Sequence, residues 1–306
     1  MTVAVTGQQY EIEAGDYRAT VTELGAGLRE LTSRGLPVIA GYDADELPPG
    51  SAGELLLPWP NRIDRGRYDF RNDEFQLALT EPAAGNAIHG LTRWMPWTAA
   101  RHEPSTVALR AVLLGQQGYP FCLELDAEYR LDPGTGLHTT ITARNSGSRA
   151  APYGTGSHPY LSVPVASADE CELSLPAALW LPADDRGMPA GAPEPVGGTP
   201  YDFRVPRTIG STRLDHALTR LDRDGEGRAW AHLAGGGSRV SLWAGEGYRW
   251  LQVFTGDTLE HRRRRKAIAI EPMTCPPNAF ATGEDLLVLE PGASVTCTWG
   301  IRAAAG

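Results

Sequence analysis

The sequence predicts an all-β protein, a large antiparallel β-sandwich, and three observations lead to that fold class. Apolar and polar residues alternate with a period of two over 107–113, 121–131, 137–143 and 295–301, which is typical of half-buried antiparallel strands. Turn-forming residues separate these runs, and the 35 glycines and 24 prolines suit a chain that reverses direction often. Few segments show the period of an amphipathic helix.

Most of the predicted strands have one polar and one apolar face. In 121–131, Leu123 and Leu125 alternate with Glu124 and Asp126, so we expect one side to face the core and the other the solvent. The run 267–270, Ala-Ile-Ala-Ile, is apolar throughout. It therefore predicts a short buried strand.

No segment of the chain indicates a domain boundary. The stretch 182–206 is rich in Pro, Gly and Asp and predicts a long surface excursion rather than a linker. Strand-like runs continue on both sides of it with similar composition. We therefore expect residues 1–306 to form a single domain.

Composition and charge argue against several classes of function. The net charge of −9 disfavours binding to the phosphate backbone of nucleic acids, and no apolar run reaches the roughly 18 residues of a membrane span. The N-terminal sequence has neither the basic start nor the apolar segment of a signal peptide, so we expect a cytoplasmic location. The four cysteines are widely spaced and include no C-x-x-C pair, which favours free thiols over a zinc ribbon or a redox site.

The sequence also contains no motif for a cofactor or a nucleophile. It has no G-x-G-x-x-G or Walker A pattern, so no nucleotide cofactor is expected. The segment Gly154-Thr-Gly-Ser-His158 does not have the G-x-S-x-G spacing of a nucleophile elbow. By residue type, His89, His158, His216 and Glu271 are possible metal ligands, but none has a local ligand spacing, and we expect no metal.

Polar residues that interrupt the strand pattern near Gly and Pro are the candidate functional groups, because such groups concentrate on loops held by a rigid scaffold. Taken singly, most have an ordinary structural explanation: an Asn-Arg pair forms a turn, a lone histidine bonds to backbone, and an Asp caps a turn. Gln252 differs, because it shares the expected face of Trp250 and Phe254, which suits a sugar-binding wall better than a dry core. The candidates are Asn61, Arg62, His89, His158, Asp215, Gln252 and Glu271.

Glu271 is the most informative of these residues. It follows the apolar run 267–270 directly and precedes Pro272. Burial beside Ile268 and Ile270 would raise its pKa above the reference value of about 4.3, and a carboxylate with a raised pKa is suited to act as a general base near neutral pH. The alternative is a strand-end glutamate stabilised by solvent or by an arginine.

Taken together and in this order, the candidate segments resemble the aldose 1-epimerase (galactose mutarotase) family. The resemblance runs from about 61 to 300 and is strongest in Gly156-Ser-His-Pro-Tyr160, in 271–280 (Glu-Pro-Met-Thr-Cys-Pro-Pro-Asn-Ala-Phe) and in Leu289-Glu-Pro-Gly292. It implies a β-sandwich of the galactose-mutarotase type, with a sugar cleft on a concave sheet face and no cofactor.

The resemblance also implies a catalytic role for three candidates. Glu271 falls where the family has its catalytic base, and His158 falls where it has its general acid. His89 matches the second active-site histidine of the family. An acid and a base beside one acetal carbon suffice to open and close a sugar ring.

The remaining candidates match substrate-binding positions. Asn61 and Arg62 match the pair that holds the sugar, Asp215 looks like the acidic residue that binds sugar hydroxyls, and Gln252 looks like the glutamine of the family's cleft. An aromatic ring is also expected to stack on the apolar face of the sugar. The aromatic candidates are Trp59, Tyr160 and Trp250.

The predicted function is therefore that of an aldose 1-epimerase, which interconverts the α and β anomers of a free aldohexose such as glucose or galactose. The expected partner is a small-molecule sugar, and the sequence carries no signal for an oligomeric state. Two alternatives stay open. A hexose-phosphate 1-epimerase on the same fold would bind its phosphate through the basic run Arg262 to Lys266, which is heavier than the resemblance implies, although such runs are usually solvated loops. A non-catalytic carbohydrate-binding protein would need no acid–base pair.

Overall fold

Nine antiparallel strands form the larger of two facing sheets in the computed structural model of the protein, which describes residues 3–305. The predicted runs at 107–113, 121–131, 137–143 and 295–301 lie in four neighbouring strands at the centre and one side of this sheet. In order across the sheet the strands are β10 (Thr98–Glu103), β11 (Thr106–Leu113), β12 (Leu123–Asp132), β13 (Gly136–Asn145), β27 (Ser294–Ala305), β23 (Ser238–Ala244), β22 (Ala229–Gly235), β17 (Glu172–Ser174) and β20 (Arg207–Thr208).

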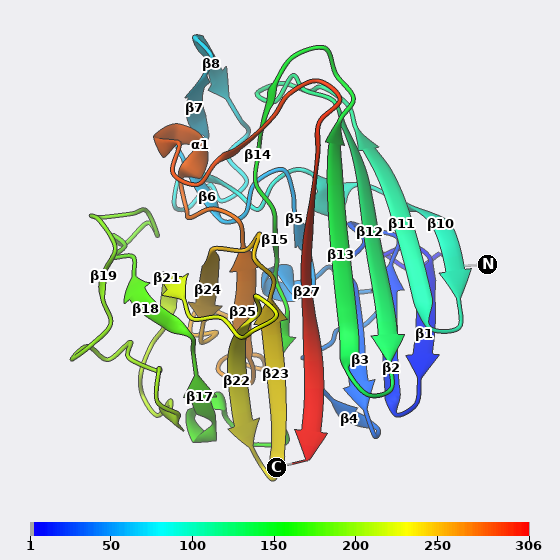
Figure 1. Ribbon diagram of the computed structural model, residues 1–306, viewed down its shortest axis with the longest axis vertical. Coiled ribbons are helices and arrows are strands. Elements are labelled where there is room, and N and C mark those ends of the chain that lie inside the picture. The colour runs from blue at the N-terminus through cyan, green and yellow to red at the C-terminus, as the bar shows by residue number, and fades with distance from the viewer. Residues whose placement is uncertain (1–2, 306) are drawn as a thin grey trace.

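A second antiparallel sheet of eight strands lies behind the first in Figure 1. The apolar run 267–270 enters its central strand, as the sequence predicts. The path across this sheet is β19 (Glu194–Pro195), β18 (Ala177–Trp180), β21 (Asp215–Leu221), β24 (Trp250–Phe254), β25 (Ile268–Met273), β15 (Gly156–Ser157) and β5 (Leu55–Leu56), and β16 (Tyr160–Leu161) also pairs with β25.

Smaller elements complete the fold. A four-stranded sheet runs β1 (Gln9–Ala14), β2 (Tyr17–Thr22), β3 (Leu28–Ser33) and β4 (Leu36–Pro37), and three strand pairs are β14 (Ala151–Tyr153) with β26 (Leu287–Leu289), β6 (Arg62–Asp64) with β9 (Asn86–Ile88), and β7 (Arg67–Phe70) with β8 (Asp73–Gln76). The helices among the described residues are short: the 3-10 turns η1 (Pro49–Ser51), η2 (Thr92–Trp94) and η3 (Ala168–Glu170), and α1 (Ala279–Thr282). None of the helices in residues 3–305 has the length and apolar character to cross a membrane.

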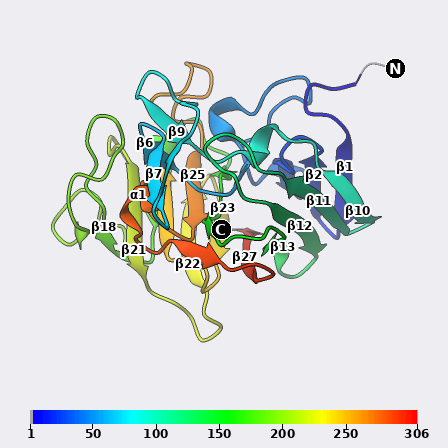
Figure 2. The ribbon, with the colours of Figure 1, turned by 90° about the horizontal axis from the view of Figure 1, so that it is seen from above.

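The hydrophobic core lies between the two large sheets. Leu125 and Ile141 from the larger sheet and Val253 and Ile270 from the smaller one belong to a single cluster of buried side chains. Successive side chains of a strand point to opposite faces of the sheet. One face of each sheet therefore packs in the core, and the other face points away from it. Viewed from above, the elements spread from β1 and β10 at one end to β18 and β21 at the other (Figure 2). The predicted antiparallel all-β class is confirmed.

The stretch 182–206 is more deeply packed than a surface excursion. It contains β19, which pairs with β18 at the edge of the smaller sheet, and it buries the side chains of Met188, Val196 and Phe203. Apolar residues spaced along this Pro-rich segment anchor it to the core. The expectation of a single domain over 1–306 stays a prediction. The four cysteines are free thiols, as expected.

Candidate active site

A cavity of about 240 Å³ opens on the face of the smaller sheet that is turned away from the core, and we call it the site cavity. Its walls include every candidate from the sequence, which are Asn61, Arg62, His89, His158, Asp215, Gln252 and Glu271. A larger hollow of about 640 Å³, between the β2–β4 region and the ends of β23 and β27, contains none of them. We place the site in the smaller cavity because titratable groups from distant segments converge there.

Strand register explains why three of these side chains meet. Gln252 on β24 lies directly opposite Glu271 on β25, and Ala217 on β21 lies opposite Gln252. Asp215 is two residues before Ala217, so its side chain shares their face. The amide Nε2 of Gln252 donates a 2.7 Å hydrogen bond to Oδ1 of Asp215. Gln252 therefore links an acidic side chain at the mouth of the cavity to the strand that carries Glu271.

Glu271 is almost fully buried, with 2% of its surface exposed. Burial and the nearby charge of Asp215 raise its pKa well above the usual value, although Arg62 opposes the shift. The raised pKa agrees with the expectation from the apolar run. The neighbours of Glu271 are not the ones expected from the sequence. Ile270 points into the core between the sheets, whereas Ala269 packs in a separate cluster on the side of the site cavity.

His158 lies between β15 and β16, directly beside Glu271. Its Nε2 is 3.3 Å from Oε1 of Glu271, and its ring stacks on Tyr160 with the centroids 5.0 Å apart. Burial is the main cause that lowers the pKa of His158 to about 3. The lowered pKa of His158 favours the neutral imidazole, and the raised pKa of Glu271 favours the protonated carboxyl. A general acid must carry a proton, and the lowered pKa of His158 disfavours one. The sequence could not reveal this effect, because it does not show how completely the ring is buried.

His89 lies in a sharp turn that requires the left-handed backbone conformation at two successive residues. His89 and Gly90 both have positive φ values, 60° and 72°, and a Cβ on Gly90 would lie 1.9 Å from the carbonyl oxygen of Leu57. The turn brings the His89 ring edge-on to the His158 ring, with centroids 5.3 Å apart. Burial lowers the pKa of His89 well below its usual value, and electrostatic interaction with His158 and Arg93 adds to the shift.

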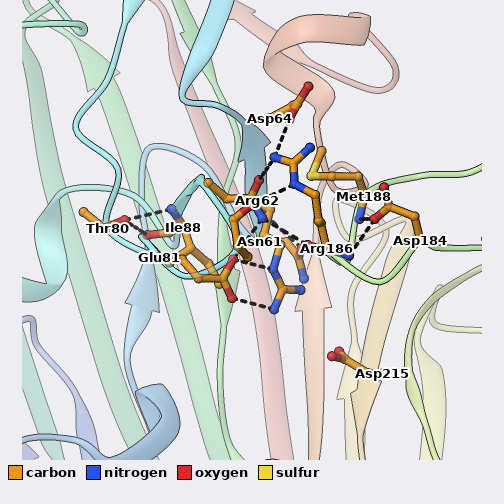
Figure 3. A network of polar contacts seen from close by, with 12 residues as sticks. Asn61, Arg62, Asp64, Thr80, Glu81, Ile88, Asp184, Arg186, Met188 and Asp215 are labelled. Carbon is orange, nitrogen blue, oxygen red and sulfur yellow. Dashed lines mark hydrogen bonds and ion pairs between the residues drawn. The ribbon is translucent and has the colours of Figure 1, made fainter.

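Arg62 is held by a glutamate that the sequence analysis did not identify. Glu81 accepts hydrogen bonds of 2.8 and 2.9 Å from its Nε and Nη2, as Figure 3 shows. Burial alone would lower the pKa of Arg62, but the hydrogen bonds of Glu81 and the charges of Asp215 and Glu81 outweigh it and leave the pKa raised. Asn61, in the left-handed conformation with a φ of 53°, accepts a bond from the Arg62 amide at its Oδ1. Glu81 thus fixes the guanidinium at the wall of the cavity.

The structure also shows which of the possible metal ligands and stacking aromatic residues lie outside the site cavity. His216 packs against Trp180 and Tyr201 and does not line the site cavity. Trp59 and Trp250 are buried elsewhere, whereas the third aromatic candidate, Tyr160, does line it.

The basic run lies outside the site cavity and is mostly engaged by acidic residues. Arg262 and Arg263 both form ion pairs with Glu46. Arg265 pairs with Asp169 and Asp257. No residue of the run lines the cavity.

Several residues that line or support the cavity were not among the candidates from the sequence. Phe254 lines the cavity, and the period of two already places it on the strand face of Gln252. Ser51 and Arg93 also line it, and Glu54 lies behind them in an ion pair with Arg93. Nothing in the local sequence marks these last three, because their contacts join segments about 40 residues apart.

His89, His158 and Glu271 are also the residues of this site that could hold a metal ion. Their ligand atoms all lie within 4.8 Å of one another, and all three side chains are buried. Histidine nitrogens and carboxylate oxygens are ligands for zinc. The expectation that the protein uses no metal stays a prediction.

The architecture and site define the class of protein to which the chain belongs. Solved structures with the same fold include a GalM/aldose epimerase homologue from C. elegans, with a TM-score of 0.88 and 21% identity over 97% of this chain and 99% of that one. Another is galactose 1-epimerase from Lactobacillus acidophilus, with a TM-score of 0.85 and 21% identity over 100% of this chain and 97% of that one. The fold is that of the galactose mutarotases.

The chain belongs to the aldose 1-epimerase family, whose sequence profile matches residues 8–302. The family that the sequence motifs resemble is therefore confirmed. The protein YihR of Escherichia coli, described as uncharacterized, is 38% identical over 287 residues, which cover 94% of this chain and 90% of that protein. Human galactose mutarotase is 26% identical over 234 residues, which cover 72% of this chain and 66% of that protein.

Proposed function

We propose that the protein is an aldose 1-epimerase that interconverts the α and β anomers of a free aldohexose of the glucose or galactose type. The observation that carries the proposal is the contact between Glu271 Oε1 and His158 Nε2, 3.3 Å apart in a buried cavity whose rim offers groups for sugar hydroxyls. Family membership supports the same reaction class.

The reaction needs two proton transfers at one acetal carbon. Glu271 takes the proton of the C1 hydroxyl while His158 gives a proton to the ring oxygen O5, and the C1–O5 bond breaks. The resulting aldehyde rotates about the C1–C2 bond. Closure on the other face reverses both transfers, so protons balance without an external acid or base.

The proton that His158 needs is already present in the pair. In the proposed mechanism the pair holds one proton, and the raised pKa of Glu271 and the lowered pKa of His158 both favour its place on the carboxyl. Moving that proton across 3.3 Å to Nε2 of His158 creates the ionised base and the protonated acid together. The competent form is thus a tautomer of the resting form. His89, edge-on to His158, lies where it can stabilise charge at O5.

The other candidates would hold the sugar while its bond rotates. Arg62, fixed by Glu81, and Asp215, bonded to Gln252, offer charge-assisted hydrogen bonds to hydroxyl groups. Tyr160 lines the cavity and offers an aromatic surface to the C–H face of the sugar.

A free sugar fits the charges of the cavity better than a sugar phosphate. The basic run that a phosphate site would use is ion-paired outside the cavity. The two arginines in the cavity wall, Arg62 and Arg93, each contact a carboxylate already. The buried pair of Glu271 and His158 favours an enzyme over a purely carbohydrate-binding protein, since an acid–base pair is needed for proton transfer and binding alone does not require one.

Polarimetry of freshly dissolved α-D-glucose or α-D-galactose tests the proposal. We expect the wild-type protein to accelerate mutarotation, and Glu271→Gln or His158→Ala to lower the catalysed rate by about 100-fold or more. Glu246→Gln, an exposed glutamate outside the cavity, serves as the matched control and should keep the full rate. No acceleration by the wild type would refute the function, and activity confined to glucose 6-phosphate would favour the phosphate epimerase.

A further inference from the structure

A buried ion pair joins Arg93 in the wall of the site cavity to Glu54 behind it, and it has no part in the proposed proton transfers. Nη1 of Arg93 lies 3.3 Å from Oε2 of Glu54 and donates a 3.2 Å hydrogen bond to Oγ of Ser51. The two charged side chains are only 9% and 2% exposed. Arg93 and Ser51 both line the cavity.

Stability alone does not account for this pair. The cost of removing two charges from water often exceeds their attraction, and apolar residues of similar volume are frequently as stable or more stable at such positions. Burial raises the pKa of Glu54, against the charge of Arg93. Nε of Arg93 is buried with no hydrogen-bond partner among the described residues, a further cost. The arrangement therefore calls for a role at the cavity that it lines.

The ion pair joins the two segments that carry the histidines. On one side, the amide of His158 donates to the carbonyl of Glu54, and the amide of Gly53 donates to the carbonyl of His158, at 3.0 and 2.9 Å. The backbone of 53–54 thus contacts His158 from both ends. On the other side, Arg93 in η2 is four residues beyond His89, on the chain that leaves the His89–Gly90 turn.

We propose that Arg93 and Glu54 are positioning residues, whose ion pair holds the His89 segment against the His158 segment and so keeps the two imidazole rings edge-to-face in the site cavity. Their ring centroids are 5.3 Å apart at an interplanar angle of 84°. Displacement of a catalytic group by about 1 Å can lower a rate by about 100-fold. The pair therefore acts on the catalytic step rather than on sugar affinity. Its kinetic test rests on the proposed function, whereas its spectroscopic test does not.

The experiment compares the single variant Glu54→Gln with the double variant Glu54→Leu/Arg93→Met. Glu54→Gln leaves the buried guanidinium unpaired and should unfold at a lower denaturant concentration. The double variant should recover the midpoint of the wild type, because both charges are gone. We nevertheless expect its kcat for mutarotation to remain at least about 10-fold low, with KM within about threefold of the wild type.

A matched control pair and an independent spectrum complete the test. Arg263 and Glu46 form a partly buried ion pair, with a 2.6 Å contact, outside the cavity, and Glu46→Leu/Arg263→Met should leave kcat unchanged. In protein with isotope-labelled histidine, the nuclear Overhauser contact between the His89 and His158 rings should weaken in the Glu54→Leu/Arg93→Met variant.

Three results would overturn the positioning role. One is a kcat that recovers together with stability in the double variant. Another is a raised KM with an unchanged kcat, which would make Arg93 a direct contact of the sugar. The third is an unaltered nuclear Overhauser contact between the two rings in the double variant. This result would refute the positioning role even if the wild-type protein had no mutarotase activity.

Discussion

Replacing Glu271 by Gln should change how the free energy of unfolding depends on pH. In the folded protein Glu271 keeps its proton to well above its usual pKa, and the pKa of His158 is lowered to about 3. In the unfolded chain the carboxyl loses its proton above about 4.3 and the imidazole gains one below about 6.5. Between these values, while Glu271 stays protonated, each state binds one proton at the pair. In the wild type, the pair of Glu271 and His158 therefore does not make the free energy of unfolding depend on pH in this window.

In the Glu271→Gln variant the folded and unfolded states no longer bind the same number of protons. With Gln at 271, the folded pair binds no proton until His158 titrates at about 3, while the unfolded chain still binds one below about 6.5. The state that binds more protons is favoured as pH falls, so the variant is destabilised relative to the wild type by about 1.4 kcal/mol per pH unit. From pH ~6.5 to ~4.5 the difference grows by about 2.7 kcal/mol.

Urea denaturation followed by tryptophan fluorescence at intervals between pH ~4.5 and ~7 measures this difference. His89 also has a lowered pKa, but it is present in both proteins and cancels in the comparison. The loss of the contacts of the carboxyl group shifts the whole curve of the variant by an amount that does not depend on pH, so only the difference in slope between the two curves reports the proton on Glu271. If the two curves stay parallel within about 0.5 kcal/mol, the proton does not reside on Glu271 and the reasoning fails.

Three further predictions concern the geometry and the charges around the site. Gly90→Ala should cost more than about 3 kcal/mol in urea denaturation, since its φ is 72° and the new Cβ would lie 1.9 Å from a carbonyl oxygen. Asp215→Asn removes a charge that raises the pKa of Glu271, so the alkaline limb of the pH–rate profile should move to lower pH, and an unmoved limb would contradict the coupling. Arg265→Ala should destabilise the protein by about 2 kcal/mol, because the side chain is largely buried against two carboxylates, whereas exposed Arg264→Ala should cost less than about 0.5 kcal/mol. Neither arginine substitution should alter KM for the sugar, because both residues lie outside the cavity.

Local patterns in the sequence account for much of the fold. The alternation in 121–131 has one physical cause, the opposite orientation of successive side chains in a strand, and it correctly predicts β12 and its apolar face. The run 267–270 likewise predicts a buried strand, which continues through Glu271 to Met273, and hence a buried carboxyl with a raised pKa. These features depend on neighbours in the chain and are visible without coordinates.

The partners of the site residues could not be predicted in this way. Glu81 reaches Arg62 only through the β6–β9 pairing, and the ion pair of Arg93 with Glu54 joins segments 39 residues apart. Packing of 182–206 onto the smaller sheet is equally non-local. Such contacts follow from how strands are ordered across a sheet, and side-chain periodicity carries no information about that order.

By itself, the sequence determined the all-β class and the family, and it supplied the candidate residues that the structure brings to one cavity, because motifs and periodicity are local properties of the chain. Only the tertiary structure showed that Glu271 and His158 form a buried pair whose pKa values are shifted in opposite directions. The pKa values of Glu271 and His158 depend on how completely each is removed from water, and that burial is set by strands and loops from the whole length of the chain. For the same reason, the structure alone showed that the basic run is occupied by acidic partners away from the cavity.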